Sequence, residues 1–286
     1  MDIVEIKPKK SDIGNFDVQR FLPSAQKRSV GPFIFFDEMG PTVLQVGQGM
    51  DVAPHPHIGL STLTWLIEGE IVHRDSLGYT QTIRPGEVNW MTAGRGIVHS
   101  ERSDTDDRNS ARPLYGLQIW LALPSDKQEI APSFQHVKAH ELPKVTHDRA
   151  EATIIAGHAF GQTSPVLVHS PTVYLDVKIK IGGNFQLASE YEEQAIYILK
   201  GQGTVCNHSF QKGEFLVLPT HDVEITAETD LHFLVLGGKA LQTRRHMWWN
   251  FVSTSKERIE QAKLDWSEGR FDPVPGERER IELPSR

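Results

Sequence analysis

Short apolar runs rich in β-branched and aromatic residues recur along most of the chain, and glycine or proline separates them. In the first half these runs include STLTWLIEGEIV, YTQTIRPGEVNWM and LYGLQIWLAL. A second series begins at Thr172 and contains TVYLDVKIKI, QAIYILKGQGTV and LHFLVLGG. Many short strands at regular spacing are typical of β-barrels and β-sandwiches. The pattern therefore predicts an all-β protein.

The two series resemble each other. LIEGEIV at 66–72 is similar to ILKGQGTV at 198–205, and IRPGEVNWM at 83–91 is similar to FQKGEFLVL at 210–218. Each of these segments is a strand, a turn that contains glycine, and a second strand. Self-similarity of this kind predicts a duplicated fold.

The segment 131–150 is polar and interrupted by proline, and we interpret it as a linker. It separates an expected N-terminal domain, 1–130, from an expected C-terminal domain, 151–286. One helix is predicted near the end of the chain, because Thr254 and Glu257 have the spacing of a capping box. Apolar residues then follow at helical spacing, and a glycine ends the helix: Ile259, Ala262, Trp266 and Gly269.

Composition narrows the function classes. The chain has 286 residues, of which 38% are hydrophobic and 23% charged, as expected for a packed globular protein. The net charge of −7 argues against binding nucleic acid by bulk electrostatics. A single cysteine, Cys206, excludes an intrachain disulfide and a cysteine-based metal site. We recognise no targeting or membrane-spanning segment, and we expect a cytoplasmic protein that does not bind membranes.

Two pairs of metal-ligand residues stand out. In PHPHIG, the prolines exclude a helix, so the chain is extended and His55 and His57 lie on one face. In GRGIVHSER, His99 and Glu101 have the same spacing. Either pair alone is typical of surface or core residues, but together they predict one site for a divalent transition metal: Fe, Ni, Cu, Mn or Zn. His73 is a rival ligand, which we place at the surface near a hairpin tip.

These motifs resemble those of the cupin superfamily. Many cupins carry a carboxylate ligand three or four residues beyond His-x-His, where this chain has Ser61 and Thr62. Glu101 replaces it, and this exchange resembles the pirin family of bicupins. The segments that carry the likeness are PHPHIG, FDEMGP, HRDSLG and NWMTAGRGIVHSE.

The resemblance implies two cupin domains, each a β-barrel or jelly roll. The N-terminal one would hold one metal ion per chain, usually iron as Fe(II), through His55, His57, His99 and Glu101. Some pirins open the heterocyclic ring of flavonols such as quercetin with O2, which predicts a quercetin 2,3-dioxygenase-like oxidoreductase. Others are protein-binding regulators, including redox-responsive transcription cofactors and modulators of metabolic enzymes. That role, or a metal-free structural bicupin, is the alternative.

For the enzyme, the expected ligands are a small, flat flavonol-like substrate and O2, bound by a monomer. Glu101 would act as the general base that accepts the substrate's hydroxyl proton. Four apolar side chains would either line a slot for the substrate or form ordinary barrel core: Phe36, Trp65, Trp90 and Met91.

The C-terminal domain is predicted to bind no metal. Aligning the glycine turns of the two series places other residues at the four ligand positions: Leu187, Ser189, Thr226 and Glu228. Only one of these is a good metal ligand, and a transition-metal site needs at least three.

Overall fold

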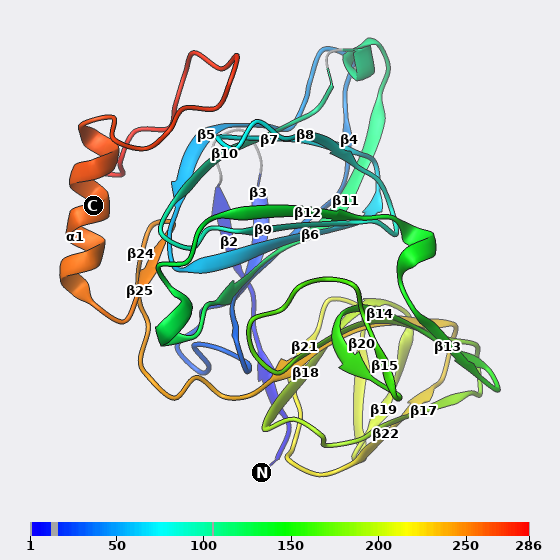
Figure 1. The fold of residues 1–286 in the computed structure, drawn as a ribbon. Helices are drawn as coiled ribbons and strands as arrows, with labels where there is room; N and C mark the ends of the chain where they lie inside the picture. Colours follow the sequence, from blue (N-terminus) through cyan, green and yellow to red (C-terminus); the bar gives the residue numbers. More distant parts are fainter. Residues whose placement is uncertain (1, 13–16, 105, 286) are drawn as a thin grey trace. The chain divides into compact units, whose positions relative to one another are not determined.

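The computed structural model describes residues 2–12, 17–104 and 106–285, and the chain divides into two compact units (Figure 1). We call them the N-terminal barrel and the C-terminal barrel. The N-terminal barrel comprises Lys10–Arg20, Phe35–Ala139 and Gln242–Arg286. The C-terminal barrel comprises Met1–Lys9, Phe21–Ile34 and His140–Leu241.

Two antiparallel sheets build the N-terminal barrel. The larger has the order β12-β9-β6-β11-β4-β3-β2, and the smaller has the order β5-β10-β7-β8. The larger sheet consists of β12 (Ser133–Val137), β9 (Val88–Thr92), β6 (Leu60–Glu68), β11 (Arg112–Ala122), β4 (Phe33–Leu44), β3 (Asp17–Leu22) and β2 (Lys9–Asp12). The smaller consists of β5 (Asp51–His57), β10 (Ile97–Arg102), β7 (Ile71–Asp75) and β8 (Thr80–Ile83).

The C-terminal barrel repeats this plan. Its larger sheet has the order β1-β21-β18-β23-β16-β14-β13, with β15 paired to β14, and its smaller sheet has the order β17-β22-β19-β20. The larger sheet consists of β1 (Val4–Ile6), β21 (Phe215–Val217), β18 (Glu193–Lys200), β23 (Leu231–Gly238), β16 (Thr172–Ile179), β14 (Ala150–Ala159), β13 (Lys144–His147) and β15 (Gln162–Thr163). The smaller consists of β17 (Asn184–Leu187), β22 (Val223–Ala227), β19 (Gln202–Val205) and β20 (His208–Gln211).

The matching strand orders confirm the predicted all-β fold and its duplication. The repeated glycine turns explain why the likeness survives in the sequence. Gly69 and Gly201 have φ angles of +85° and +86°, in the region that side chains other than glycine rarely adopt. A Cβ atom at either position would also lie 2.4 Å from a backbone oxygen, that of Pro113 or of Asp230. Glycine is therefore required at the same turn in both barrels.

The predicted linker is wrong, because residues 131–150 contain two paired strands. β12 adds to the larger sheet of the N-terminal barrel next to β9, and β13 pairs with β14 in the C-terminal barrel. β12 looks polar in the sequence, but Val137 is buried and Phe134 stacks on a ring inside the barrel. Residues 242–286 also belong to the N-terminal barrel, although we predicted them in the C-terminal domain.

The helix α1 (Lys256–Ser267, orange in Figure 1) forms where it was predicted, but its cap differs. Ser255 is the N-cap, and its hydroxyl accepts a hydrogen bond from the backbone N–H of Arg258. Thr254 instead approaches the side chain of Gln128. The predicted apolar face is confirmed, since Ile259, Ala262 and Trp266 are buried. No helix in the described part of the chain has the length and apolar character needed to cross a bilayer.

This helix supports the strands that carry the histidine pairs. Its buried face packs in one apolar cluster with Ile58 and Val98, which directly follow and precede His57 and His99. Fully burying a side chain of this size contributes roughly 1.5–3 kcal/mol. The helix therefore helps to fix the β5 and β10 backbones from the side opposite the imidazoles.

Candidate metal centre

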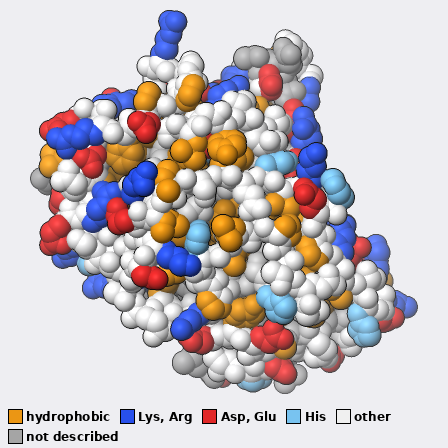
Figure 2. Space-filling view, viewed as in Figure 1, with side chains coloured by type: hydrophobic (Ala, Val, Ile, Leu, Met, Phe, Trp, Pro, Cys, Tyr) orange, Lys and Arg blue, Asp and Glu red, His pale blue; other side chains and the backbone are white. Residues whose placement is uncertain are grey.

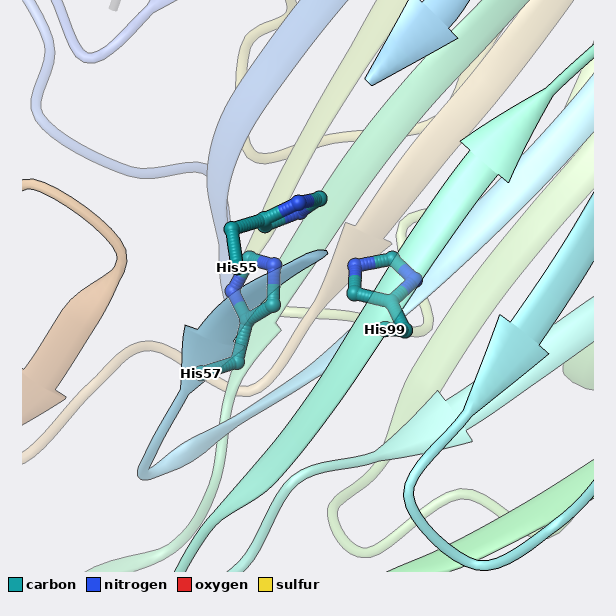
Figure 3. A group of neighbouring side chains, drawn as sticks. All are labelled: His55, His57 and His99. Atoms are coloured by element: carbon teal, nitrogen blue, oxygen red, sulfur yellow. The ribbon is translucent and has the colours of Figure 1, made fainter. Parts of the chain in front are cut away.

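Three imidazoles converge inside the N-terminal barrel. His55 and His57 come from β5 and His99 from the neighbouring β10, and their rings face one another (Figure 3). One potential ligand atom from each residue lies within 4.8 Å of the other two. All three side chains are buried, with exposed fractions of 6%, 1% and 1%. The structure thus brings together three of the four predicted ligands.

The local sequence explains how β5 presents two imidazoles. β5 is the first strand of its sheet, so Pro54 and Pro56 do not remove hydrogen bonds from a central ladder. The strand is extended, as predicted, and residues two apart share a face. His55 pairs directly with His99, which places one imidazole of β5 beside that of β10. The register shifts between His99 and Glu101, so that a bulge lies next to the histidine pair.

The ring nitrogens fit a bound metal ion. The Nδ1–H of His55 donates to the backbone oxygen of Ala53 at 2.9 Å, which leaves Nε2 as a lone-pair donor. Nδ1 of His57 and Nε2 of His99 are buried and have no hydrogen-bond partner among the described residues. Buried polar atoms are rarely left unpaired, and a metal ion would satisfy both. The donor set therefore fits the metal that the sequence predicted.

Burial keeps these imidazoles neutral. It lowers the pKa of His55 to about 4, against the hydrogen bond to the Ala53 oxygen that raises it. Burial, together with the neighbouring imidazoles, holds the pKa values of His57 and His99 well below the ordinary range. Neutral imidazole is the form that binds a metal, so the site needs no proton release from histidine near pH 7.

Glu101 lies on the same strand as His99 but outside the group of three. Its carboxylate is 7% exposed and lies 3.3 Å from the Thr64 hydroxyl, which in turn lies 2.9 Å from Oε1 of Gln118. Burial raises the pKa of Glu101 to about 7, although the hydrogen bond from Thr64 opposes the shift. A carboxyl group with this pKa can hold or release a proton at neutral pH, as a general base must.

The raised pKa of Glu101 predicts a pH-dependent stability difference in metal-free protein. The folded state binds more protons than the unfolded state between about pH 4.5 and pH 7, so Glu101 destabilises the fold as pH rises through that window. Glu101→Gln removes the penalty. The free energy of unfolding of Glu101→Gln minus that of the wild type should therefore increase by about 3 kcal/mol from pH 4.5 to pH 8.

Urea unfolding of chelator-treated protein at several pH values measures this gain. Glu228→Gln, which changes an exposed carboxylate, is the matched control and should show no such trend. Because the three imidazoles are common to all variants, their own titration cancels in the comparison. A gain that is equal at pH 5 and pH 8 would contradict the buried-carboxyl assignment.

His73 is buried, and its predicted place at the surface is wrong. Its ring is on β7 and is 4% exposed, because the strand continues to Asp75 before the turn begins. The ring stacks on Phe134 with centroids 4.4 Å apart. Nε2 lies 2.9 Å from Oδ2 of Asp75, and Nδ1 lies 3.3 Å from Nδ1 of His99. His73 is therefore next to the candidate ligand His99.

Two of the four apolar residues weighed for the slot are buried on the other face of the sheet, and they form barrel core, the alternative that the sequence left open. Thr64 pairs with Asn89, and Thr64 faces Glu101, so neighbouring Trp65 and Trp90 point to the opposite side. Met91 is two residues from Asn89 and shares its side, which is the face of the candidate site. Neighbouring residues on a strand face opposite sides of the sheet, so Met91 faces the candidate site and Trp90 does not.

Other aromatic side chains surround the imidazoles. Trp120 makes an edge contact with His57, with centroids 5.1 Å apart, and Phe35 stacks on Trp120 at 3.9 Å. Phe36, for which the sequence left slot and core open, is fully buried and alternates with Phe35 along β4. Phe134 completes this group through its contact with His73. We overlooked these rings because the β-strand faces were not assigned from the sequence.

The C-terminal tail contacts both ligand strands, which the sequence pattern did not indicate. Glu277 accepts hydrogen bonds from the Ser100 hydroxyl at 2.9 Å and from the Arg102 guanidinium. The backbone N–H of Ile281 donates to the oxygen of Pro54. Ser100 and Pro54 adjoin the candidate ligands, so the tail braces β5 and β10.

In the C-terminal barrel, strand register corrects two of the predicted equivalences. Glu101 pairs with His73 on β7, and the equivalent pair on β19 and β22 is Val205 with Ile225. His99 pairs with His55, and Val223 pairs with Leu187. The residues at the positions of His99 and Glu101 are therefore Val223 and Ile225, not Thr226 and Glu228, because the loops before them differ in length.

We accordingly predict one metal ion per chain. Leu187, Val223 and Ile225 are buried and apolar, and none can coordinate a metal. Among the described residues, the three-imidazole group is the one cluster of three or more potential ligand side chains. Elemental analysis of purified protein, with protein concentration from amino-acid analysis, should give a ratio near one. A ratio near two would show that a second site exists.

The fold and the site define a class of protein: a bicupin whose N-terminal barrel carries a candidate metal centre. The chain belongs to the pirin family. Residues 15–121 match the family model for pirin, and residues 174–272 match the model for the pirin C-terminal cupin domain.

Several known proteins are similar over nearly the whole chain. A pirin-like protein from Caulobacter vibrioides is 46% identical over 92% of this chain and 92% of its own. A putative quercetin 2,3-dioxygenase from Pseudomonas aeruginosa is 37% identical over 93% of this chain and 85% of its own. The crystal structure of quercetin 2,3-dioxygenase from Acinetobacter baumannii aligns with a TM-score of 0.91 at 36% identity, covering 99% of this chain and 95% of that one.

Proposed function

We propose that this protein is a metal-dependent dioxygenase that opens flavonols such as quercetin with O2. The observation that carries the proposal is the convergence of three buried, neutral imidazoles, two of which have a ring nitrogen without a hydrogen-bond partner among the described residues. The same strand as His99 carries a carboxyl group, that of Glu101, whose pKa burial raises to about 7. The likeness to proteins named quercetin 2,3-dioxygenase supports the substrate class.

His55, His57 and His99 would hold the metal, with Glu101 as the fourth ligand. We propose Fe(II) as the ion, with Ni, Cu, Mn and Zn as alternatives that suit the same imidazole and carboxylate donors. A bound divalent ion would supply Lewis acidity, which favours the deprotonated form of a coordinated substrate hydroxyl. The carboxylate of Glu101 lies beside Thr64, outside the group of three imidazoles, so its role as the fourth ligand is part of the proposal.

The proposed role of Glu101 is proton transfer. As a carboxylate it accepts the proton of the flavonol hydroxyl, and the electron pair of that O–H bond remains on the substrate oxygen. Burial raises the pKa of Glu101 to about 7 in the metal-free protein, and a bound cation would lower it, so the group would be ionised and able to take the proton at neutral pH. The Thr64 hydroxyl orients one carboxylate oxygen from the opposite sheet.

Substrate orientation would come from the aromatic side chains. Trp120 and Phe134 contact the rings of His57 and His73, and aromatic pairs gain about 0.5–1.5 kcal/mol beyond simple burial.

Acidic and basic side chains are intermixed over the face drawn in Figure 2. The described cavities of about 290 and 450 Å³ are lined by residues other than the imidazoles. The proposed dioxygenase function is therefore supported by the chemistry of the buried imidazoles and not by the size of a cavity.

Two measurements test the proposal together. Protein purified without added metal is analysed for its metal content, and then incubated with quercetin in air while absorbance and O2 are followed. Loss of the flavonol absorbance with matching O2 consumption is expected for the metal-loaded protein and not for chelator-treated protein. Fully loaded protein that leaves quercetin unchanged would contradict the enzyme and favour the protein-binding regulator.

A further inference from the structure

Asp75 and His73 form a buried hydrogen-bonded chain that ends at His99. Both residues are on β7, next to β10, and they pair across the two strands with His99 and Glu101 respectively. Asp75 is fully buried, and the His73 ring is held flat against Phe134. None of the proton-transfer steps above uses either residue.

The carboxylate of Asp75 has a defined role for each oxygen. Oδ1 accepts two backbone hydrogen bonds, from the N–H of Leu77 at 2.9 Å and from that of Tyr79 at 3.1 Å. Oδ2 lies 2.9 Å from Nε2 of His73. An ionised carboxylate can only accept hydrogen bonds, so Nε2 of His73 must carry the hydrogen.

The position of the hydrogen on His73 determines which nitrogen of His99 carries a hydrogen. A neutral imidazole with its hydrogen on Nε2 has a lone pair on Nδ1, and this lone pair lies 3.3 Å from Nδ1 of His99. Two facing lone pairs would repel, so the hydrogen between the rings belongs to Nδ1 of His99. Nε2 of His99 is then left with a lone pair, and it is the nitrogen that has no partner among the described residues.

We infer that Asp75 and His73 are positioning residues that set the tautomer of His99, so that its Nε2 is always available as a metal ligand. This role rests on the proposed metal site. A histidine ligand whose second nitrogen is hydrogen-bonded has a fixed ring orientation and is a stronger donor. Here the hydrogen bond is relayed through a second imidazole from a buried carboxylate.

The sharpest test is Asp75→Asn. The two backbone N–H groups hold the amide oxygen at the position of Oδ1, so the NH2 group must face His73. That group donates to Nε2 of His73 and moves the ring hydrogen to Nδ1. His73 then donates to His99, whose own hydrogen moves to Nε2 and blocks the metal.

A second variant, His73→Phe, keeps a ring against Phe134 but removes the relay. His99 is then free to adopt either tautomer, so the loss of metal affinity should be smaller than in Asp75→Asn. A purely structural role predicts the opposite order, because His73→Phe is the larger chemical change and leaves a carboxylate oxygen unpaired. In the double variant, the amide introduced by Asp75→Asn has no neighbouring imidazole whose tautomer it could change. The metal affinity should therefore equal that of the single variant His73→Phe.

Two measurements test the effect on the His99 tautomer independently of the proposed dioxygenase activity. Nitrogen NMR of histidine-labelled, metal-free protein reports the tautomer directly: we expect the His99 hydrogen on Nδ1 in the wild type and on Nε2 in Asp75→Asn. Affinity for Co(II), measured by chelator competition together with its absorption spectrum, should fall roughly 10- to 100-fold in Asp75→Asn. The NMR result stands even if the protein proves to have no dioxygenase activity.

The inference is wrong if wild-type His99 carries its hydrogen on Nε2. It is also wrong if folded Asp75→Asn binds Co(II) as tightly as the wild type, or if the double variant loses as much affinity as the two single changes combined. Should Asp75→Asn fail to fold, the wild-type tautomer and the Co(II) affinity of His73→Phe decide the question. Circular dichroism of each metal-free variant provides the folding control.

Discussion

Replacing His57 or His99 with alanine is expected to reduce the metal content from about one ion per chain to nearly none. Each imidazole is one of three whose ligand atoms lie within 4.8 Å of one another, and each contributes a buried nitrogen without a hydrogen-bond partner among the described residues. Removing one leaves two imidazoles of the group of three, and Glu101 lies outside that group, beside Thr64. Transition-metal sites in proteins need at least three well-placed ligands, so binding should become too weak to survive purification.

Elemental analysis of freshly purified variants measures this loss. The matched control is His158→Ala, because the His158 ring is exposed on β14 of the C-terminal barrel and bonds only to the Thr163 hydroxyl among the contacts described for it. Thermal unfolding of the metal-free proteins shows whether each variant is folded. If His57→Ala and His99→Ala fold and retain full metal content, the site is elsewhere.

The pairs of candidate ligands could be predicted because β-strands have a period of two. His55 and His57 are separated by one residue, as are His99 and Glu101, so each pair shares a face wherever its strand lies. The repeated glycine turns likewise revealed the duplication, since backbone geometry requires glycine at these positions.

Other features depend on pairing between strands, which no local pattern contains. The sequence left open whether Trp65 and Trp90 line the site or form barrel core, and only strand register shows that they face the other side. His73 appeared to lie at a hairpin tip, and only the length of β7 shows that it is buried beside His99. The support from α1 and the tail arises from contacts between distant segments, such as that of Ser100 with Glu277, which are 177 residues apart in sequence.

The largest effect on turnover is expected for Glu101→Gln, which should slow quercetin degradation by roughly 10²–10⁴-fold. Glutamine keeps the size of the side chain and one oxygen that could bind a metal or accept the Thr64 hydrogen bond. It cannot accept the hydroxyl proton of the substrate, because an amide oxygen is far less basic than a carboxylate. Proton transfer should therefore suffer more than metal binding.

Metal occupancy must be measured in the same sample, since the amide is also a weaker ligand than the carboxylate. Rates divided by bound metal then report the chemistry alone. The pH profile gives a second readout: the wild-type rate should rise with pH as Glu101 loses its proton, below pH 7 because the bound cation favours the carboxylate, and the variant should lack that rise. If Glu101→Gln retains its metal and turns over quercetin at the wild-type rate, a group other than Glu101 accepts the proton.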